Sequence, residues 1–389
     1  MLPDLPPWPV YSEAERTAVA RVLERGLGNY WYGSEGKAFE QEFASYCGAN
    51  HGLAVANGTV ALELCLRALG VGPGDEVVTT PRSFIATANS IVLCGARPVF
   101  ADVDPDSQNI TPASVEAVIT GNTCAILVVH LAGWPCDMAG LRELAAAKGL
   151  HLVEDCAQAH GAAVSGAKVG SLGDIAAFSF CHDKIISTGG EGGMLITNDE
   201  ELWAKAAAFR NHGRDPRSRP GDNHEYQYLH GSAGSNYRMT EMQSAIGRHQ
   251  LTRLGPWLEE RRRNAALLRD ALHDLEILRI PAPADHISHA FYRFYVFLNR
   301  GKLRPEWDRA RIIDALRNDG IPCDSGICPE IYREPAYRDT STPGRSRLPA
   351  ARELGETAIA FPVYPGIGDE LMAEMAGSIR AVLTRNFKS

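Results

Sequence analysis

Short apolar runs alternate with longer stretches of helical spacing between about residue 53 and residue 197. Strands buried in a parallel sheet are apolar on both faces, so they appear as short, nearly continuous apolar runs. The alternation therefore predicts an α/β fold with a mostly parallel sheet flanked by helices. The predicted strands are residues 53–56, 76–79, 98–101, 125–129, 151–154, 175–180 and 193–197.

Several helices have recognisable ends. Ser12 and Glu15 have the spacing of a capping box, and a helical stretch over residues 59–69 stops at Gly70. The pattern changes after about residue 211, where residues 210–220 are polar and predict an exposed loop. Beyond this loop we expect two long helices, over residues 240–254 and 257–275, and then mixed strands and helices. We predict a large domain over residues 1–250 and a smaller α+β domain over residues 251–389.

Composition narrows the class of protein. The chain has 389 residues and a formal net charge of −8, which argues against nucleic acid or an anionic membrane as the main partner. The nine cysteines show no C-x-x-C spacing, so we expect scattered reduced thiols and no metal site. The first ten residues do not resemble a signal peptide, and no apolar run is long enough for a membrane span. These features predict a soluble, cytoplasmic enzyme.

Polar residues that could take part in catalysis follow two of the predicted strands. Asp155 comes directly after one strand, with Gln158 three residues and His160 five residues further on. Lys184 lies between another strand and a glycine-rich turn that lacks the Walker pattern. Buried lysines can form Schiff bases, because burial near other cations frees the nucleophilic amine. From these local patterns alone, a helix cap for the acid and a surface position for the lysine stay open.

Two further segments lie at the starts of predicted helices. Residues 57–62, Asn-Gly-Thr-Val-Ala-Leu, follow a strand and open a helix, so they fit either a phosphate site or a plain helix cap. Residues 234–239, Gly-Ser-Asn-Tyr-Arg-Met, precede the first long helix and carry little meaning alone.

Taken together and in order, these four segments resemble the DegT-type nucleotide-sugar aminotransferases, a branch of the fold-type I pyridoxal-phosphate enzymes. The resemblance covers roughly residues 10 to 380 and extends through residues 72–77, 95–100 and 170–174. It implies a fold-type I aminotransferase architecture, with a large cofactor domain and a small C-terminal domain.

The resemblance also implies roles for individual residues. Lys184 matches the lysine that binds pyridoxal phosphate covalently and then moves a proton between carbon and cofactor. Asp155 would face the pyridine nitrogen and keep it protonated, so that the ring can accept electrons. Gln158 would bond to the phenolic oxygen of the cofactor, and Phe84 would stack on its ring, although core packing is the alternative for Phe84.

Phosphate binding in the family matches Gly58, Thr59 and Ser179 of one subunit and Asn236 of the neighbouring subunit. The resemblance therefore implies a homodimer with active sites at the subunit interface. Such an enzyme passes the amino group through pyridoxamine phosphate, from an amino acid that is usually L-glutamate to a keto-hexose on a nucleoside diphosphate, most often of the 4-keto-6-deoxy type. The pathway implied is amino-sugar biosynthesis, for a cell-surface polysaccharide such as O-antigen or for an antibiotic.

Although the chain is acidic overall, a local cluster of basic residues could bind the negatively charged sugar diphosphate. Its members are Arg210, His212, Arg214, Arg217, Arg219 and Arg238, with a solvated loop as the alternative for Arg217 and Arg219. We take His160, Arg210, His212 and Arg238 as candidate substrate-binding residues. Ala132 and Trp134 replace the tyrosine and glutamine of many relatives, which predicts a differently lined substrate pocket.

Three alternatives stay open. A pyridoxamine-dependent sugar dehydratase of the same fold would have a histidine in place of the lysine, and Lys184 argues against it. A keto-cyclitol aminotransferase would use the same cofactor residues on another ketone. A regulator that binds the cofactor without catalysis is disfavoured, because a complete set of cofactor residues would be superfluous there.

Overall fold

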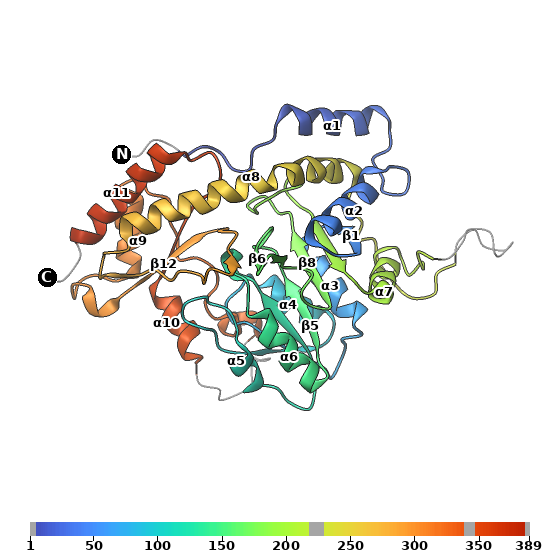
Figure 1. Ribbon diagram of the computed structural model, residues 1–389. Helices are drawn as coiled ribbons and strands as arrows, with labels where there is room; N and C mark the ends of the chain where they lie inside the picture. Colours follow the sequence, from blue (N-terminus) through green and yellow to red (C-terminus); the bar gives the residue numbers. More distant parts are fainter. Residues whose placement is uncertain (1–4, 218–228, 338–346, 386–389) are drawn as a thin grey trace.

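The computed structural model describes residues 5–217, 229–337 and 347–385. The largest sheet of the described residues has seven strands (Figure 1). Its strands are β1 (His51–Val55), β2 (Glu76–Thr79), β3 (Arg97–Phe100), β4 (Thr123–Val129), β5 (His151–Asp155), β8 (Ile175–Ser179) and β9 (Gly193–Thr197). The order is β1-β9-β8-β5-β4-β2-β3, and β9 runs antiparallel to both of its neighbours while the other pairs are parallel. Each of the seven predicted strands is present, so the predicted mostly parallel sheet is confirmed.

Eleven α-helices are described, some packed on this sheet and others in the C-terminal part of the chain. They are α1 (Glu13–Glu24), α2 (Glu35–Cys47), α3 (Gly58–Ala68), α4 (Ala86–Leu93), α5 (Pro112–Glu116), α6 (Met138–Lys148), α7 (Glu200–Arg210), α8 (Glu241–Leu272), α9 (Arg309–Asn318), α10 (Pro349–Thr357) and α11 (Asp369–Arg385). Two small sheets complete the fold: β10 (Leu278–Arg279), β12 (Phe294–Leu298) and β13 (Ala358–Phe361) form one, and β6 (Ala163–Val164), β7 (Ala167–Lys168) and β11 (Ile287–Ser288) form the other. The described residues contain no helix with the length and apolar character needed to cross a membrane.

The two long helices expected after residue 240 are one continuous helix, α8, which passes through Pro256. The prediction of a break was wrong because tertiary packing outweighs the cost of an interior proline, about 3 kcal/mol. Leu254, Trp257 and Leu258 are buried on either side of Pro256, and α8 packs against α1, α2 and α11.

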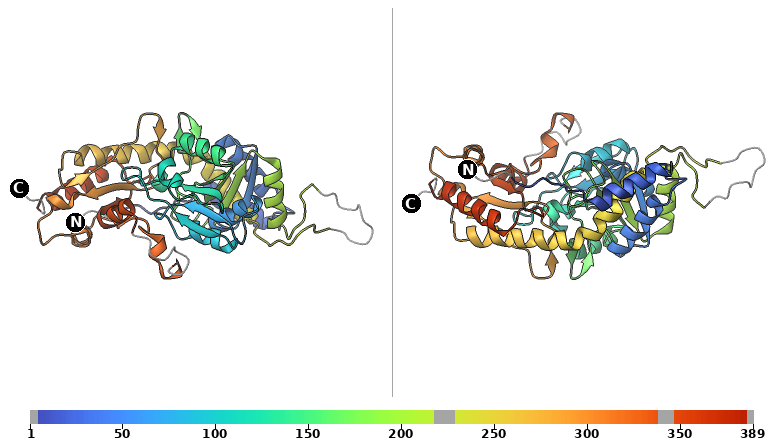
Figure 2. Two further views of the ribbon diagram at one scale, coloured as in Figure 1. Left: turned by 90° about the horizontal axis from the view of Figure 1, so that it is seen from below. Right: turned by 90° about the horizontal axis from the view of Figure 1, so that it is seen from above.

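Helix α8 therefore belongs to both parts of the molecule. It extends from the orange and red C-terminal part to the blue and green sheet domain (Figure 2). Trp257 and Leu258 join a core cluster with the sheet domain, whereas Leu268 and Leu272 join the core of the C-terminal part. The boundary predicted at residue 250 thus falls inside a helix, and the division into domains stays a prediction.

Candidate active site

The predicted site residues gather at the carboxyl ends of two adjacent parallel strands. Asp155 is the last residue of β5, and Ser179 is the last residue of β8, which pairs with β5. Open α/β sheets bind ligands at this edge, because the chain leaves the sheet there and the side chains that follow are free to converge.

The Asp155 carboxylate is buried and held by a short chain of hydroxyl groups. Thr87 on α4 donates a hydrogen bond to Asp155 Oδ2 at 2.8 Å, and the amide of Ala157 donates to Oδ1 at 3.1 Å. Ser83 Oγ lies 2.8 Å from the Thr87 hydroxyl and must be the donor to it, since Thr87 has only one proton to give. Burial raises the pKa of Asp155, although these bonds and the positive charge of Lys184 act in the opposite direction.

Lys184 lies in the turn after β8, in the same site as Asp155. Only 14% of its side chain is exposed. Its Nζ lies 3.5 Å from Asp183 Oδ1 and 4.9 Å from the centre of the Tyr292 ring, and Trp8 Nε1 donates to its backbone carbonyl at 3.0 Å. The amine therefore lies between Asp183 and Tyr292 and is still partly accessible, as a nucleophile requires.

The start of α3 forms a cradle for an anion. The side chain of Asn57 caps the helix by accepting from the amide of Val60 at 3.0 Å, which makes Gly58 and Thr59 the first helical residues. Their amides have no partner within the helix, as is usual at a helix start. A Cβ on Gly58 would lie 2.6 Å from the Cβ of Ser179, so only glycine lets the helix start approach the end of β8 this closely. This arrangement suits a phosphate group.

Gln158 and Phe84 occupy positions that fit their predicted roles. Gln158 is buried, and its Oε1 accepts from the amide of Ala132 at 2.8 Å, which leaves the side-chain NH₂ as a donor. Phe84 is 61% exposed, so the alternative of core packing does not apply to it in this chain. An aromatic ring exposed beside this sheet edge is available to stack on a flat ligand.

Two predicted substrate-binding residues lie in the protein core instead. His160 is fully buried among the rings of Phe43, Phe178 and Phe180, and burial lowers its pKa to about 3, so it is neutral. Arg210 is also buried, and its Nη1 donates to Glu40 at 2.6 Å and to a backbone carbonyl at 2.9 Å. Because both side chains are buried, the structure gives no support to either as a substrate ligand, and the two assignments stay predictions.

Other members of the basic cluster, and the predicted phosphate ligand Asn236, are exposed or half-buried. His212 and Asn236 are exposed, and Arg238 is half-buried, with Nη1 donating to Asn211 at 3.2 Å. Arg217 forms ion pairs with Glu201 and Asp215 on the surface, which favours the solvated-loop interpretation. Arg219 lies outside the described residues.

One buried cluster has the residue types of a metal site, formed by His130, Glu154 and Cys156. The atoms of Glu154 already accept from three backbone amides at 2.6–2.8 Å, and His130 Nε2 lies 2.9 Å from the same carboxylate. His130 Nδ1 accepts from the amide of Cys136 at 3.0 Å, so Nε2 carries the proton that bonds to Glu154. Glu154 on β5 therefore holds the loop of residues 170–173 and His130 in place by hydrogen bonds.

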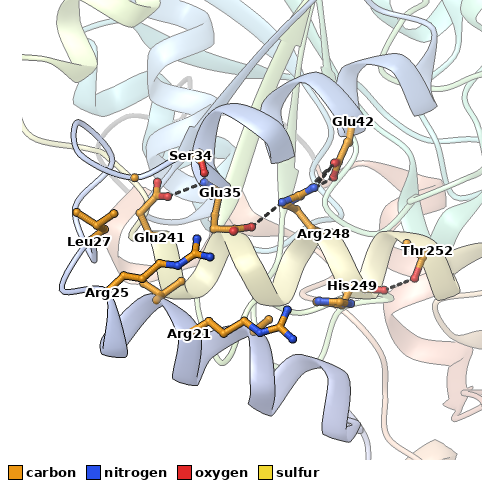
Figure 3. A pocket seen from close by; sticks show the side chains of 13 residues that line it. Arg21, Arg25, Leu27, Ser34, Glu35, Glu42, Glu241, Arg248, His249 and Thr252 are labelled. Atoms are coloured by element: carbon orange, nitrogen blue, oxygen red, sulfur yellow. Dashed lines mark hydrogen bonds and ion pairs between the residues drawn. The ribbon is translucent and has the colours of Figure 1, made fainter.

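A cavity of about 350 Å³ lies apart from this edge, between α1, α2 and α8 (Figure 3). Glu241 at the start of α8 accepts from the amides of Glu35 and Gly36, the first two residues of α2, at 2.6 and 3.0 Å. Arg248 binds Glu35 and Glu42 on α2 (Figure 3). None of the predicted site residues lines this cavity. The hydrogen bonds of Glu241 and the ion pairs of Arg248 hold α2 against α8.

Sequence reasoning did not identify two residues that contact the site. Thr87 follows Phe84 by three residues, and residues three apart at a helix start lie on the same side. This spacing is the signal that could have placed Thr87 in the site beside Phe84. Tyr292 lies 109 positions from Asp183, its hydrogen-bond partner, and no local pattern indicates that contact.

Comparison with known proteins gives a consistent result. Residues 9–380 match the model of the DegT/DnrJ/EryC1/StrS aminotransferase family. The chain is 38% identical over 370 residues to a UDP-N-acetyl-3-dehydro-alpha-D-glucosamine 3-aminotransferase of Acidithiobacillus ferrooxidans, covering 94% of this chain and 93% of the relative. It is also 38% identical over 360 residues to a GDP-perosamine synthase of Caulobacter vibrioides, covering 91% and 92%.

A solved structure has the same fold along nearly the whole chain. The aminotransferase from Psychrobacter cryohalolentis superimposes with a TM-score of 0.95 at 44% identity, covering 98% of this chain and all of that one. The resemblance inferred from the motifs is confirmed: the chain is an aminotransferase and belongs to the DegT/DnrJ/EryC1/StrS aminotransferase family.

Proposed function

We propose that this aminotransferase uses pyridoxal phosphate to move an amino group from an amino acid, L-glutamate in the first instance, to a keto-hexose linked to a nucleoside diphosphate. The observation that carries the proposal is the buried Asp155 carboxylate in the same site as Lys184, beside the anion cradle at the start of α3. Asp155 would bind the ring nitrogen, and Gly58, Thr59 and Ser179 would hold the phosphate. When bound, the cofactor supplies an electron sink for deprotonation at carbon.

The residues of the chain perform the remaining tasks. Lys184 as a neutral amine takes a proton from the donor carbon, holds it as an ammonium group, and returns it to a second carbon. Gln158 would donate to the cofactor with its side-chain NH₂, and Phe84 would stack on its ring. The same order in reverse delivers the amino group to the ketone.

A nucleotide-linked sugar is the substrate class that two observations support. The relatives named above are a UDP-sugar aminotransferase and a GDP-perosamine synthase. In this chain, Arg238 is half-buried and has no carboxylate partner in the described ranges, which suits it to bind a diphosphate. We assign a 4-keto-6-deoxyhexose as the acceptor and amino-sugar biosynthesis as the pathway. The free thiols of all nine cysteines fit a reducing compartment, so we place the reaction in the cytoplasm.

The experiment that tests the reaction follows the absorbance of the bound cofactor. L-Glutamate added to the pyridoxal-phosphate-loaded protein should convert it to the pyridoxamine phosphate form, and a nucleotide-linked 4-keto-6-deoxyhexose should restore the original spectrum. Borohydride should fix the cofactor to Lys184, as seen by mass spectrometry. No spectral change with glutamate or glutamine, or no label on Lys184, would refute the proposal.

We also propose a homodimer in which Asn236, exposed here, completes the phosphate site of the neighbouring subunit. Mixtures of the inactive Lys184→Ala and Asn236→Ala variants should then regain activity. In a hybrid dimer, one of the two sites takes an intact Lys184 from one subunit and an intact Asn236 from the other. Absence of recovery after demonstrated subunit exchange would contradict the shared site.

A further inference from the structure

Lys184 has two close neighbours outside the predicted cofactor site, Asp183 and Tyr292. The Tyr292 hydroxyl donates to Asp183 Oδ2, while Asp183 Oδ1 lies 3.5 Å from Lys184 Nζ. The same amine lies 4.9 Å from the centre of the Tyr292 ring, within the range of a cation–π contact. An ammonium group on Lys184 is thus placed between a carboxylate and an aromatic face.

The position of Tyr292 is fixed by backbone contacts rather than by its side chain alone. Its amide donates to the carbonyl of Ala132 at 2.8 Å, and its own carbonyl accepts from Arg261 Nη1 at 3.4 Å. Arg261 is buried in α8, and Tyr292 is only 8% exposed. Phe291 before it has a φ of +46°, a left-handed conformation that non-glycine residues rarely adopt, so the surrounding structure holds this loop in one shape.

Asp183 is arranged to stay ionised. Burial raises its pKa, but the charge of Lys184, the bond from Tyr292 and the charge of Arg293 together lower it below the usual value. The charged or titratable groups that also act on or around Lys184 are Asp155, His160 and Cys181. His160 is neutral, and Asp155 is engaged with Thr87 and Ala157, which leaves Asp183 as the carboxylate in ion-pair contact with the amine.

We propose that Asp183 and Tyr292 are positioning residues that hold the ammonium form of Lys184 in place while it carries the proton between two carbons. The proposal rests on the role of Lys184 in the proposed function. The proton balance is simple: the neutral amine gains the proton from the donor carbon and becomes an ammonium group, Asp183 stays anionic throughout, and the proton leaves for the second carbon. Tyr292 acts through Asp183 with its hydroxyl and on the ammonium directly with its ring.

The first test uses cofactor-free protein, so it does not depend on the reaction. An amine-selective reagent is applied at pH 8, and the labelling rate of Lys184 is measured by mass spectrometry of its peptide. Asp183→Asn should raise this rate about three- to ten-fold, because the amine then loses the carboxylate contact that holds it away from the reagent. Tyr292→Phe should give a smaller increase, since Asp183 is half-exposed and turns toward water when its anchor is lost. The matched control is Asp369→Asn. It removes a carboxylate from a surface ion pair with Arg263 and should leave the labelling rate of Lys184 unchanged.

The double variant decides whether Tyr292 acts through Asp183. Tyr292→Phe should change the labelling rate little when Asp183→Asn is already present, because the hydroxyl has lost its acceptor. An unchanged rate in Asp183→Asn, or an equal effect of Tyr292→Phe in both backgrounds, would overturn the proposal. Thermal unfolding of each variant shows whether the fold is intact.

The second test examines proton transfer itself. With glutamate deuterated at the α-carbon, the isotope effect on the glutamate half-reaction should be larger in Asp183→Asn than in the parent, with kcat about ten-fold lower and KM within two-fold. A purely structural role would lower the amount of active protein and leave the isotope effect as it is, and that result would count against the proposal. If the parent protein does not react with glutamate at all, the proposed function fails, while the labelling test still judges the contact of Asp183 with Lys184.

Discussion

The hydroxyl chain from Ser83 through Thr87 to Asp155 allows a quantitative prediction. Thr87→Val keeps the shape of the side chain and removes the hydroxyl, so Asp155 loses a donor at 2.8 Å and Ser83 loses its acceptor. A hydrogen bond to a charged group contributes about 1.5–3 kcal/mol, and a buried carboxylate has no water to replace it. With an unfolding entropy of about 2.1 cal/mol/K per residue, each kcal/mol corresponds to about 1.2 °C in a chain of this length. The expected fall in Tm of the cofactor-free protein at pH 7 is therefore about 2–4 °C.

The pH dependence of this loss has a definite sign. The pKa of Asp155 is raised in the folded protein, so folding favours the protonated carboxyl, and its contribution to stability falls as the pH rises from the unfolded value through the folded one. Thr87→Val removes a bond that favours the ionised form, which raises the pKa of Asp155 further. The difference in Tm between variant and parent should thus be smaller at pH 4 than at pH 7. Thr87→Ser keeps the hydroxyl and should stay within about 1 °C of the parent. Equal Tm values for Thr87→Val and the parent at pH 7 would refute this reasoning.

Three further substitutions test other parts of the site. Gly58→Ala places a Cβ 2.6 Å from the Cβ of Ser179, and overpacking of about 1–3 kcal/mol should weaken pyridoxal phosphate binding about five- to 150-fold in a spectroscopic titration. Arg210→Met leaves Glu40 buried without its partner and should lower the free energy of unfolding by about 3–5 kcal/mol in urea denaturation. Glu154→Gln turns an acceptor for three backbone amides into a group with an unwanted donor, and should cost about 1–3 kcal/mol in the same assay.

Each of these three has its own control. Thr59→Ser changes the cradle without adding volume and should bind the cofactor within about two-fold of the parent. Arg217→Met removes an exposed arginine of the same region and should change stability by less than about 1 kcal/mol. If Arg210→Met were as stable as Arg217→Met, the buried ion pair of Arg210 with Glu40 would not stabilise the fold as argued. If Gly58→Ala bound the cofactor normally, the close approach of Gly58 to Ser179 would not be needed for binding.

The sheet could be predicted from sequence because its strands are buried on both faces and therefore appear as short apolar runs. Asp155 and Lys184 could be singled out because Asp155 ends one apolar run and Lys184 lies in the short turn after another. Burial of a polar side chain cannot be read in this way. The burial of His160 and Arg210 was not predicted, because it depends on neighbours far away along the chain, Phe43 and Glu40. The same limit explains why Tyr292 was not identified.

Helix α8 has a consequence for how the protein folds. Leu254 and Trp257, near its middle, complete the aromatic core beside the sheet, and Leu268 and Leu272, near its end, complete the C-terminal core. A fragment that ends at residue 250 would leave the first core open to water, and a fragment that begins there would carry an apolar face without a partner. We expect the two parts to melt in one cooperative transition, and neither to be expressed as a stable protein by itself.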